Sequence, residues 1–540
     1  MNPAAVKFRE LTTPASSAKS RPLPQEVDVK LTTYYFHPQS TTYMRVNKSI
    51  IYLFLIFILT FHGCATTGQR QPTVIGERPH EYQQFFIELD LVVDEYMVRE
   101  ASDFQVSGFP YLRTNRFLEA MKDRVKGDSL EIWVEWMRQL DLKARKKEIS
   151  NLPEDGFTEL TSRLPDVSNR QELLAKVTDY SERTLASDRR QTDFYDAVKS
   201  VISIAGEYSM TMRTFGLYPL AAIPVTYATE KQYKIFRDWH QSPLESLPVD
   251  GNITAFTPAI HPVYSGQDIS AIFDASRRNL LGLPDLSDNE IKALVLAYAP
   301  VIQQDVTGTF DLFGKVKWKN RHVNIAFENP TVYYYITYSL FKGEPAVQLN
   351  YSFWYSGRWG ENSPGIERGP LDGVTVRITF DPDGRPVIVD IMNNCGCYYF
   401  YVPRKERVEK VLTSSDGLYP FVPTWLPNEF PRYRLGLRIN SGWHQIQQVF
   451  AVETPPNTIT YELRPYDVLE ALPRAGGGTE SVFSPKGIMK DSSRIEPYIF
   501  FSMGIPKVGY MRQRGHHAIK LVGRAHFTDP DLFDNYFIFK

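Results

Sequence analysis

The chain has 540 residues, of which 61 are lysine or arginine and 62 are aspartate or glutamate, so its formal net charge is −1. This balance supplies no overall positive field to attract a polyanion and argues against nucleic acid as a partner. Hydrophobic residues make up 43% of the chain and charged residues 23%, a composition typical of globular proteins. A chain of this length can bury large cores without disulfide bridges.

An apolar segment of twelve residues, 50–61, follows Arg45 and Lys48 and ends at Gly63 and Cys64. A short positive region, an apolar stretch and a small residue are the three parts of a secretory signal. As a helix, twelve residues would rise about 18 Å, which is too short for the roughly 30 Å hydrocarbon core of a bilayer. The segment therefore favours a cleaved signal over a permanent transmembrane helix.

The end of this segment, Phe61-His62-Gly63-Cys64, resembles the lipobox of bacterial lipoproteins. The resemblance implies that residues 44–63 are a signal peptide and that acylated Cys64 anchors the protein to a membrane. Ala65, rather than aspartate, follows the cysteine, which resembles lipoproteins sent to the outer membrane. We therefore expect a cell-envelope protein that faces the periplasm. An uncleaved anchor and ordinary signal cleavage are the alternatives.

The segments on either side of the predicted signal carry no sustained apolar period. Residues 1–43 are rich in Ser, Thr, Pro and Lys. Because a secretory signal acts from the N-terminus, we expect translation to begin at Met44, and a disordered extension is the alternative. Residues 64–79 are polar, as expected of a flexible tether between a lipid anchor and a folded protein.

Through residues 80–215, apolar residues recur at helical spacing and charged residues lie largely on the opposite faces. Four such stripes predict four amphipathic helices, and Gly216 predicts the end of the last one. The four stripes begin near Tyr82, Asp128, Asn169 and Thr192. We therefore expect an N-terminal helical bundle.

The basic run Lys143, Arg145, Lys146 and Lys147 lies near the end of the second predicted helix. We expect a solvated helix end, which the helix dipole favours, and contact with anionic lipid is the alternative. Residues 216–289 are rich in proline and glycine, which favour turns and loops, so they are predicted to form a connector.

From residue 290 to 540 the apolar period changes from helical to alternating. Adjacent runs predict neighbouring strands, and the Asp381-Pro382-Asp383-Gly384 turn predicts a hairpin. The expected strands are 332–340, 347–355, 374–380, 387–391, 446–453, 459–463, 498–503 and 517–522. The sequence therefore predicts an α+β fold, in which the helical bundle precedes a mainly antiparallel β sandwich or open barrel.

Cys395-Gly396-Cys397 follows one of these strands directly. With Cys64 acylated, the two thiols have only each other within the chain. A local disulfide, a soft-metal site, a redox couple and two reduced thiols are the four alternatives. A disulfide across one glycine would stabilise the fold only weakly, because the loop that it closes is so short.

A metal site would need further ligands, and His516, His517 and His526 in the C-terminal segment are the candidates. Neighbouring residues of a strand point to opposite faces, so only one of His516 and His517 is expected to join Cys395 and Cys397. Such a ligand set suits zinc or copper. Histidines occupied by ordinary hydrogen bonds are the alternative.

Arg512 and Arg514 in the same segment are candidates for binding an anionic group, because paired guanidinium groups grip phosphate or carboxylate through two hydrogen bonds. Internal pairing with Asp529, Asp531 or Asp534 is the alternative.

The connection from residue 354 to 372 is long, polar and aromatic, as binding loops often are. Glu361 and Asp372 are candidates for an acid and base pair, and Arg358 for orienting an anionic group. Trp359 is a candidate platform for a sugar ring.

Signature motifs of known catalytic classes are missing from the sequence. The sequence contains no G-x-S-x-G, H-E-x-x-H or Walker A motif. We therefore expect a binding or envelope-maintenance protein whose β-rich part recognises a glycan or another envelope component. The alternative is a metal-dependent hydrolase or redox protein that uses the Cys-Gly-Cys turn and the C-terminal histidines.

Overall fold

The protein is described here from a computed structural model, which describes residues 80–540 apart from 260–265, 277, 278, 416, 454 and 456. The predicted leader, the predicted tether and Cys64 lie outside the described residues. Residues 71–540 form one compact unit. Among the helices of the described part, none is both long and apolar enough to span a bilayer.

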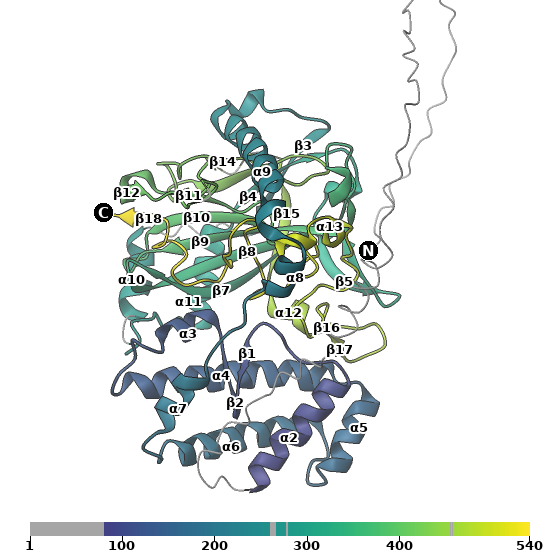
Figure 1. Cartoon of the computed structure of the whole chain (residues 1–540). Helices are drawn as coiled ribbons and strands as arrows, with labels where there is room; N and C mark the ends of the chain where they lie inside the picture. The colour runs from purple at the N-terminus through teal and green to yellow at the C-terminus, as the bar shows by residue number, and fades with distance from the viewer. Residues whose placement is uncertain (1–79, 260–265, 277–278, 416, 454, 456) are drawn as a thin grey trace, which may run out of the picture. The chain divides into compact units, whose positions relative to one another are not determined.

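A layer of helices lies below the large sheet in Figure 1. Its elements are α2 (His80–Glu95), β1 (Phe104–Val106), β2 (Phe109–Thr114), α3 (Arg116–Met121), α4 (Ser129–Asn151), α5 (Glu154–Arg163), α6 (Arg170–Asp188) and α7 (Phe194–Val201). The predicted starts of α2, α4, α6 and α7 are confirmed to within two residues. The layer is not a plain bundle, because the hairpin β1–β2 is inserted between its helices.

Amphipathic patterning explains how this layer forms its own core. Leu89, Val92 and Val93 of α2 are fully buried, as their helical spacing predicts. Trp133 of α4 is also fully buried, and its indole nitrogen donates a hydrogen bond to the carbonyl of Leu118 at 2.9 Å. The layer is therefore held by a continuous apolar core with satisfied polar groups.

The segment predicted to be a connector consists largely of regular structure. It contains α8 (Met210–Phe215), α9 (Tyr218–Gln241), η1 (Leu244–Ser246), β3 (Asn252–Pro258), α10 (Gly266–Ser276) and the start of α11 (Asp288–Tyr298). Pro219 lies in the first turn of α9, where a missing amide hydrogen has no cost. The prolines that favoured a loop prediction are therefore compatible with a helix of 24 residues.

The large sheet has ten strands in the order β11-β10-β9-β8-β7-β15-β3-β4-β13-β14, and it curls (Figure 1). The strands other than β3 are β4 (Val301–Val306), β7 (Thr331–Phe341), β8 (Glu344–Arg358), β9 (Gly369–Phe380), β10 (Pro386–Asn393), β11 (Phe400–Pro403), β13 (Arg434–Ile439), β14 (Ile446–Val452) and β15 (Ile459–Pro465). Strand β15 runs parallel to β3 and β7, and β13 runs parallel to β4. The fold is therefore mixed α/β with a mixed sheet, and an antiparallel sandwich is not what the structure shows.

Short elements complete the described part. They are η2 (Thr309–Asp311), β5 (Lys315–Lys319), β6 (His322–Ala326), η3 (Gly365–Glu367), η4 (Lys405–Arg407), β12 (Val408–Val411), α12 (Asp467–Glu470), β16 (Leu472–Pro473), β17 (Thr479–Glu480), α13 (Glu496–Ile499), η5 (Phe501–Met503) and β18 (Phe537–Phe539).

Two of the predicted strands are wrong. Residues 498–503 belong to α13 and η5, and Pro497 in the first turn of α13 favours that helical turn. Residues 517–522 form only one isolated bridge, between Ala518 and His526. The apolar residues of both segments pack as irregular chain and not as strands.

The central strands are buried on both faces. On β8, Leu349 and Tyr351 belong to the main core, while Gln348 and Asn350 on the opposite face are also almost fully buried. Asn350 donates a hydrogen bond to the hydroxyl of Thr337 on the neighbouring strand at 2.9 Å. The sheet therefore pairs its polar side chains with each other where it is covered.

A cluster of buried charges lies between α4 and β2. The Arg113 guanidinium is 2.5 Å from Glu148 and 3.2 Å from Asp141, and all three side chains are buried. Burial opposes ionisation, but the charges of Arg113 and Arg145 lower the pKa of Glu148. The arginines are therefore needed to hold these carboxylates in the interior.

We expect Arg113→Met to lower the free energy of unfolding by about 3–5 kcal/mol, because it leaves buried carboxylates without a partner. Arg183→Met is the matched control, since Arg183 pairs with Asp179 on the exposed surface of α6. It should cost less than about 1 kcal/mol. Urea unfolding of both variants measures the difference, and equal losses would contradict the role assigned to Arg113.

Candidate functional site

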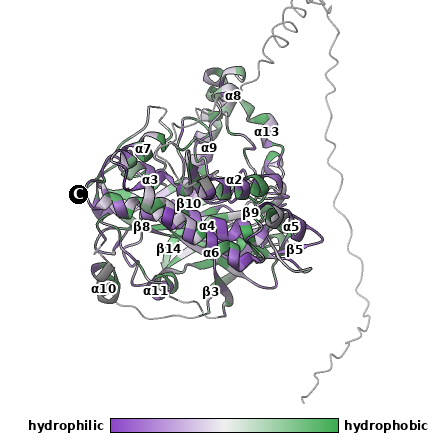
Figure 2. Cartoon of the chain, turned by 90° about the horizontal axis from the view of Figure 1, so that it is seen from below, coloured by the Kyte–Doolittle hydropathy of each residue, from purple (hydrophilic) through white to green (hydrophobic). Residues whose placement is uncertain are grey.

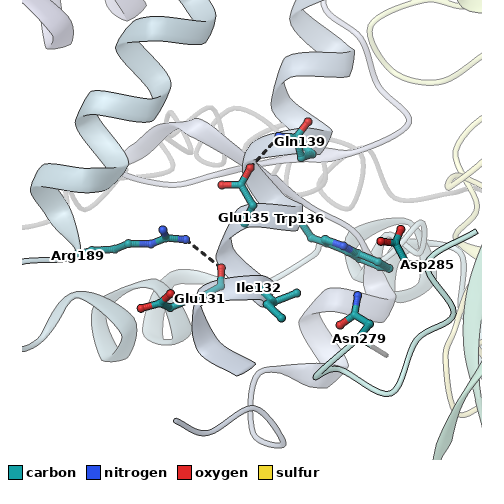
Figure 3. Close-up of a pocket in the computed structure, with 8 residues that line it drawn as sticks. All are labelled: Glu131, Ile132, Glu135, Trp136, Gln139, Arg189, Asn279 and Asp285. Atoms are coloured by element: carbon teal, nitrogen blue, oxygen red, sulfur yellow. Dashed lines mark hydrogen bonds between the residues drawn. The ribbon is translucent and has the colours of Figure 1, made fainter. Parts of the chain in front are cut away.

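A hollow of about 610 Å³ lies on the outer side of α4 (Figure 3). Two stripes of α4 at four-residue spacing line it, one polar and one apolar. The polar stripe consists of Glu131, Glu135 and Gln139, and the apolar stripe of Ile132 and Trp136. The regular spacing of the helix therefore places an aromatic ring beside a row of carboxylate and amide groups.

Side chains from two other segments complete the hollow. Arg189 comes from the end of α6, and Asn279 and Asp285 come from the segment that precedes α11. Figure 3 shows the indole of Trp136 directed toward Asn279 and Asp285. Arg189 donates a hydrogen bond to the carbonyl of Glu131 at 3.0 Å, which fixes its side chain at the rim.

The groups of the hollow are held by neighbours. Glu135 accepts hydrogen bonds from Arg138 at 2.6 and 2.9 Å and from Gln139 at 2.7 Å. Burial opposes ionisation, but these bonds lower the pKa of Glu135. The Trp136 ring lies 5.2 Å, centroid to centroid, from that of Tyr338 on β7. The hollow therefore offers an anchored aromatic ring, fixed anions and exposed amides, a set that suits a ligand with hydroxyl groups.

A second group of polar residues is fully enclosed, at His444 in the connection between β13 and β14. Its Nδ1 lies 2.8 Å from Asp372 and its Nε2 lies 3.2 Å from Asp311. The Tyr355 ring stacks on the imidazole at 3.9 Å. Burial opposes its charge, but the hydrogen bonds to Asp311 and Asp372 raise the pKa of His444. The imidazole therefore acts as a buried cation between two anions.

The same group contains Arg358, which binds Asp372 through two hydrogen bonds of 2.9 and 3.0 Å. Arg358 also donates to Glu367 at 2.6 Å. Although burial opposes ionisation, the charge of Arg358 lowers the pKa of Asp372 well below its usual range. Arg358 and Asp372 were predicted to act on a ligand, and the structure engages each with the other in the interior.

The remaining residues of the predicted loop site lie at the surface. Glu361 is exposed, and Trp359 is half exposed. Since Asp372 is fully buried, the structure does not bring Glu361 and Asp372 into one accessible cleft.

Cys395 and Cys397 are free thiols, so the local disulfide is not formed. The amide of Cys397 donates to the sulfur of Cys395 at 3.4 Å. The hydrogen bond between the thiols, together with burial, raises the pKa of Cys397. Gly396 has a φ of 90°, and a side chain there would meet the carbonyl of Ala518 at 2.3 Å, so the C-terminal segment packs on this turn.

The C-terminal histidines are occupied by other partners. His516 lies 2.8 Å from Glu207 and 2.6 Å from the carbonyl of Ala101. His526 accepts from the amide of Glu207 at 3.0 Å, and burial lowers the pKa of His517 to about 3. Within the described ranges, no three His, Cys, Asp or Glu residues gather in a way that could hold a metal ion. The predicted zinc or copper ligand set is therefore not assembled.

Arg512 and Arg514 are also paired internally, although not with the predicted aspartates. Arg514 binds Glu470 at 2.6 Å and Asp467 at 2.8 Å, and Arg512 lies 3.2 Å from Glu207. Neither guanidinium is presented to an external anion.

Sequence reasoning missed Trp136, Asp311 and His444. Trp136 had a usable signal, because it lies beside the apolar stripe of the second predicted helix and not on it, and a tryptophan there faces outward. Asp311 and His444 had none, since they are 133 residues apart in the chain.

Comparison with known proteins leaves the geometry to carry the functional argument. The chain matches no protein-family model, no curated protein and no solved structure.

We expect His444→Gln to flatten the dependence of stability on pH. Because the pKa of His444 is raised above its usual 6.5 in the folded protein, its protonation stabilises the fold fully below about pH 6.5, and this stabilisation is lost as pH rises through the raised value. The free energy of unfolding, measured in urea from pH 6 to 9, should fall more for the native protein than for the variant. His322→Gln, at an exposed histidine, should behave as the native protein does.

Proposed function

We propose that the protein is a lipid-anchored envelope protein that binds a glycan in the hollow around Trp136. The observation that carries the proposal is an aromatic ring in an open hollow beside carboxylate and amide groups. Sugar rings present apolar faces that stack on aromatic side chains, and their hydroxyl groups bond to planar polar side chains.

The size and position of the hollow support this proposal. Its volume of about 610 Å³ lies in the range of small-molecule sites. The lining comes from α4, α6 and the segment before α11, so this site differs from the cleft expected in the β-rich part. Open solvent on one side suits a segment of a longer polysaccharide that passes across the surface. A structural role in envelope maintenance would follow from such binding.

The leader supports the proposed location at the outer membrane, facing the periplasm. We expect the mature protein to carry a lipid on Cys64, so labelled palmitate should be incorporated into the native protein and not into Cys64→Ser. The variant should leave the membrane fraction or stop before processing. Cys397→Ser is the matched control and should be labelled normally. Labelling of Cys64→Ser would contradict the proposed anchor.

We expect Trp136→Ala to weaken glycan binding about tenfold or more, because stacking and burial of the ring are both lost. Intrinsic tryptophan fluorescence and calorimetry, with soluble peptidoglycan fragments and core oligosaccharide as probes, measure the change. Trp359→Ala is the matched control, since Trp359 is half exposed and lies away from the hollow.

Urea unfolding of Trp136→Ala checks that the variant keeps its fold. If neither probe binds the native protein, or if Trp136→Ala binds as tightly as the native protein, the glycan proposal is wrong.

A further inference from the structure

Helices α8 and α9 carry an exposed apolar surface. Six large hydrophobic side chains there are between 57% and 71% exposed. They are Met210, Phe215, Leu217, Leu220, Ile223 and Tyr227. Soluble proteins tolerate single exposed hydrophobic side chains, but a cluster of this size marks a contact surface.

A second exposed apolar group continues this surface on α13 and η5. Ile495, Tyr498, Ile499 and Phe501 are between 42% and 85% exposed. Figure 1 shows α8, α9 and α13 side by side, and Figure 2, seen from below, shows α8 and α13 at the same edge of the molecule. We call the ten side chains together the apolar ridge.

Hydrogen bonds join the two halves of the apolar ridge. The amide of Ser209 donates to the carbonyl of Gly504 at 2.6 Å, and the Arg213 guanidinium donates to the carbonyl of Met503 at 2.9 Å. A side chain at Gly216 would come within 2.5 Å of the Cα of Ser502. The apolar ridge is therefore fixed to the body of the protein.

Helix α9 is apolar on two sides. Tyr233 and Phe236 are buried in the main core, as expected of the inner face of a surface helix. Leu220, Ile223 and Tyr227 follow one another at spacings of three and four residues and occupy the opposite, exposed face. The outer face of a surface helix is normally polar, so this apolar face is suited to a partner outside the described chain.

Charges surround the apolar ridge and do not interrupt it. Residues 214–229 contain no charged side chain. Beyond them, α9 carries Lys231, Lys234 and Arg237 against Glu230 and Asp238. The Lys231 ammonium lies 4.4 Å from the centroid of the Tyr227 ring.

On the other side, two exposed basic residues flank the ridge, Lys507 and Arg524. The Arg524 guanidinium contacts the sulfur of Met210. An apolar surface bordered by lysine, arginine and tyrosine is the pattern of protein segments that lie at a membrane interface.

We propose that the apolar ridge docks onto a lipid bilayer, inserting its apolar side chains among the acyl chains while its basic border meets anionic headgroups. The proposal rests on the proposed envelope location. The 16 residues from Cys64 to His80 can extend to about 55 Å. A folded unit of this size has a radius of gyration of about 23 Å. The anchor therefore permits the ridge to reach the same membrane surface.

The test uses residues 71–540, the compact unit that holds every described core, without acylation. Sedimentation with vesicles of phosphatidylethanolamine and phosphatidylglycerol should show binding that weakens with salt and on neutral phosphatidylcholine vesicles. Leu220→Glu with Ile223→Glu should lower the partition coefficient about tenfold or more. Ile87→Glu with Leu91→Glu is the matched control, because both residues are 50% exposed on α2, and it should bind as the native protein does.

Three results would overturn the proposal. The first is no binding to anionic vesicles, and the second is an equal loss in both double variants. The third is a dimer in gel filtration that the Leu220 and Ile223 substitutions dissociate, since a second copy would then cover the ridge. A failure of acylation at Cys64 would leave this assay unchanged, so the two proposals fail separately.

Discussion

The C-terminal segment covers the polar face of the central strands, and the ion pair between Arg377 and Asp390 makes this covering possible. Their closest atoms are 2.6 Å apart, and both side chains are almost fully buried. The Phe527 ring lies 3.6 Å from the guanidinium, and its carbonyl accepts a hydrogen bond from Arg377. Either charge alone would be costly at this depth, whereas the pair lets an aromatic ring pack flat against the sheet.

The same segment joins the helical layer to the sheet. The Gln513 amide donates to Glu100 before β1 at 2.6 Å and to Glu470 on α12 at 3.0 Å, and His516 bonds to the carbonyl of Ala101. Burial and the charge of Glu470 raise the pKa of Glu100. The position of α4, and with it the hollow around Trp136, therefore depends on how the C-terminal segment is held against the strands.

Sequence predicted what neighbouring residues decide and missed what distant residues decide. The side chain of Asn169 caps α6 as expected, because a cap involves residues three positions apart. Lys147 was expected in solvent, yet it pairs with carboxylates of α12 more than 300 residues later. In the predicted loop site, Arg358 and Asp372 lie together, but His444, which sets their environment, is 72 residues from Asp372. No local pattern announces such a partner.

The apolar ridge and the hollow belong to one compact unit, and this has a consequence for how both would work. Arg213 fixes α8 to η5, and Phe236 fixes α9 to the main core, so neither helix can swing away without breaking buried contacts. Docking of the ridge would then set the orientation of the whole unit on the membrane. A flexible tether alone leaves the hollow free to face any direction. Two attachments, one lipid and one surface, would hold the Trp136 hollow at a defined height, where a polysaccharide of the envelope can reach it.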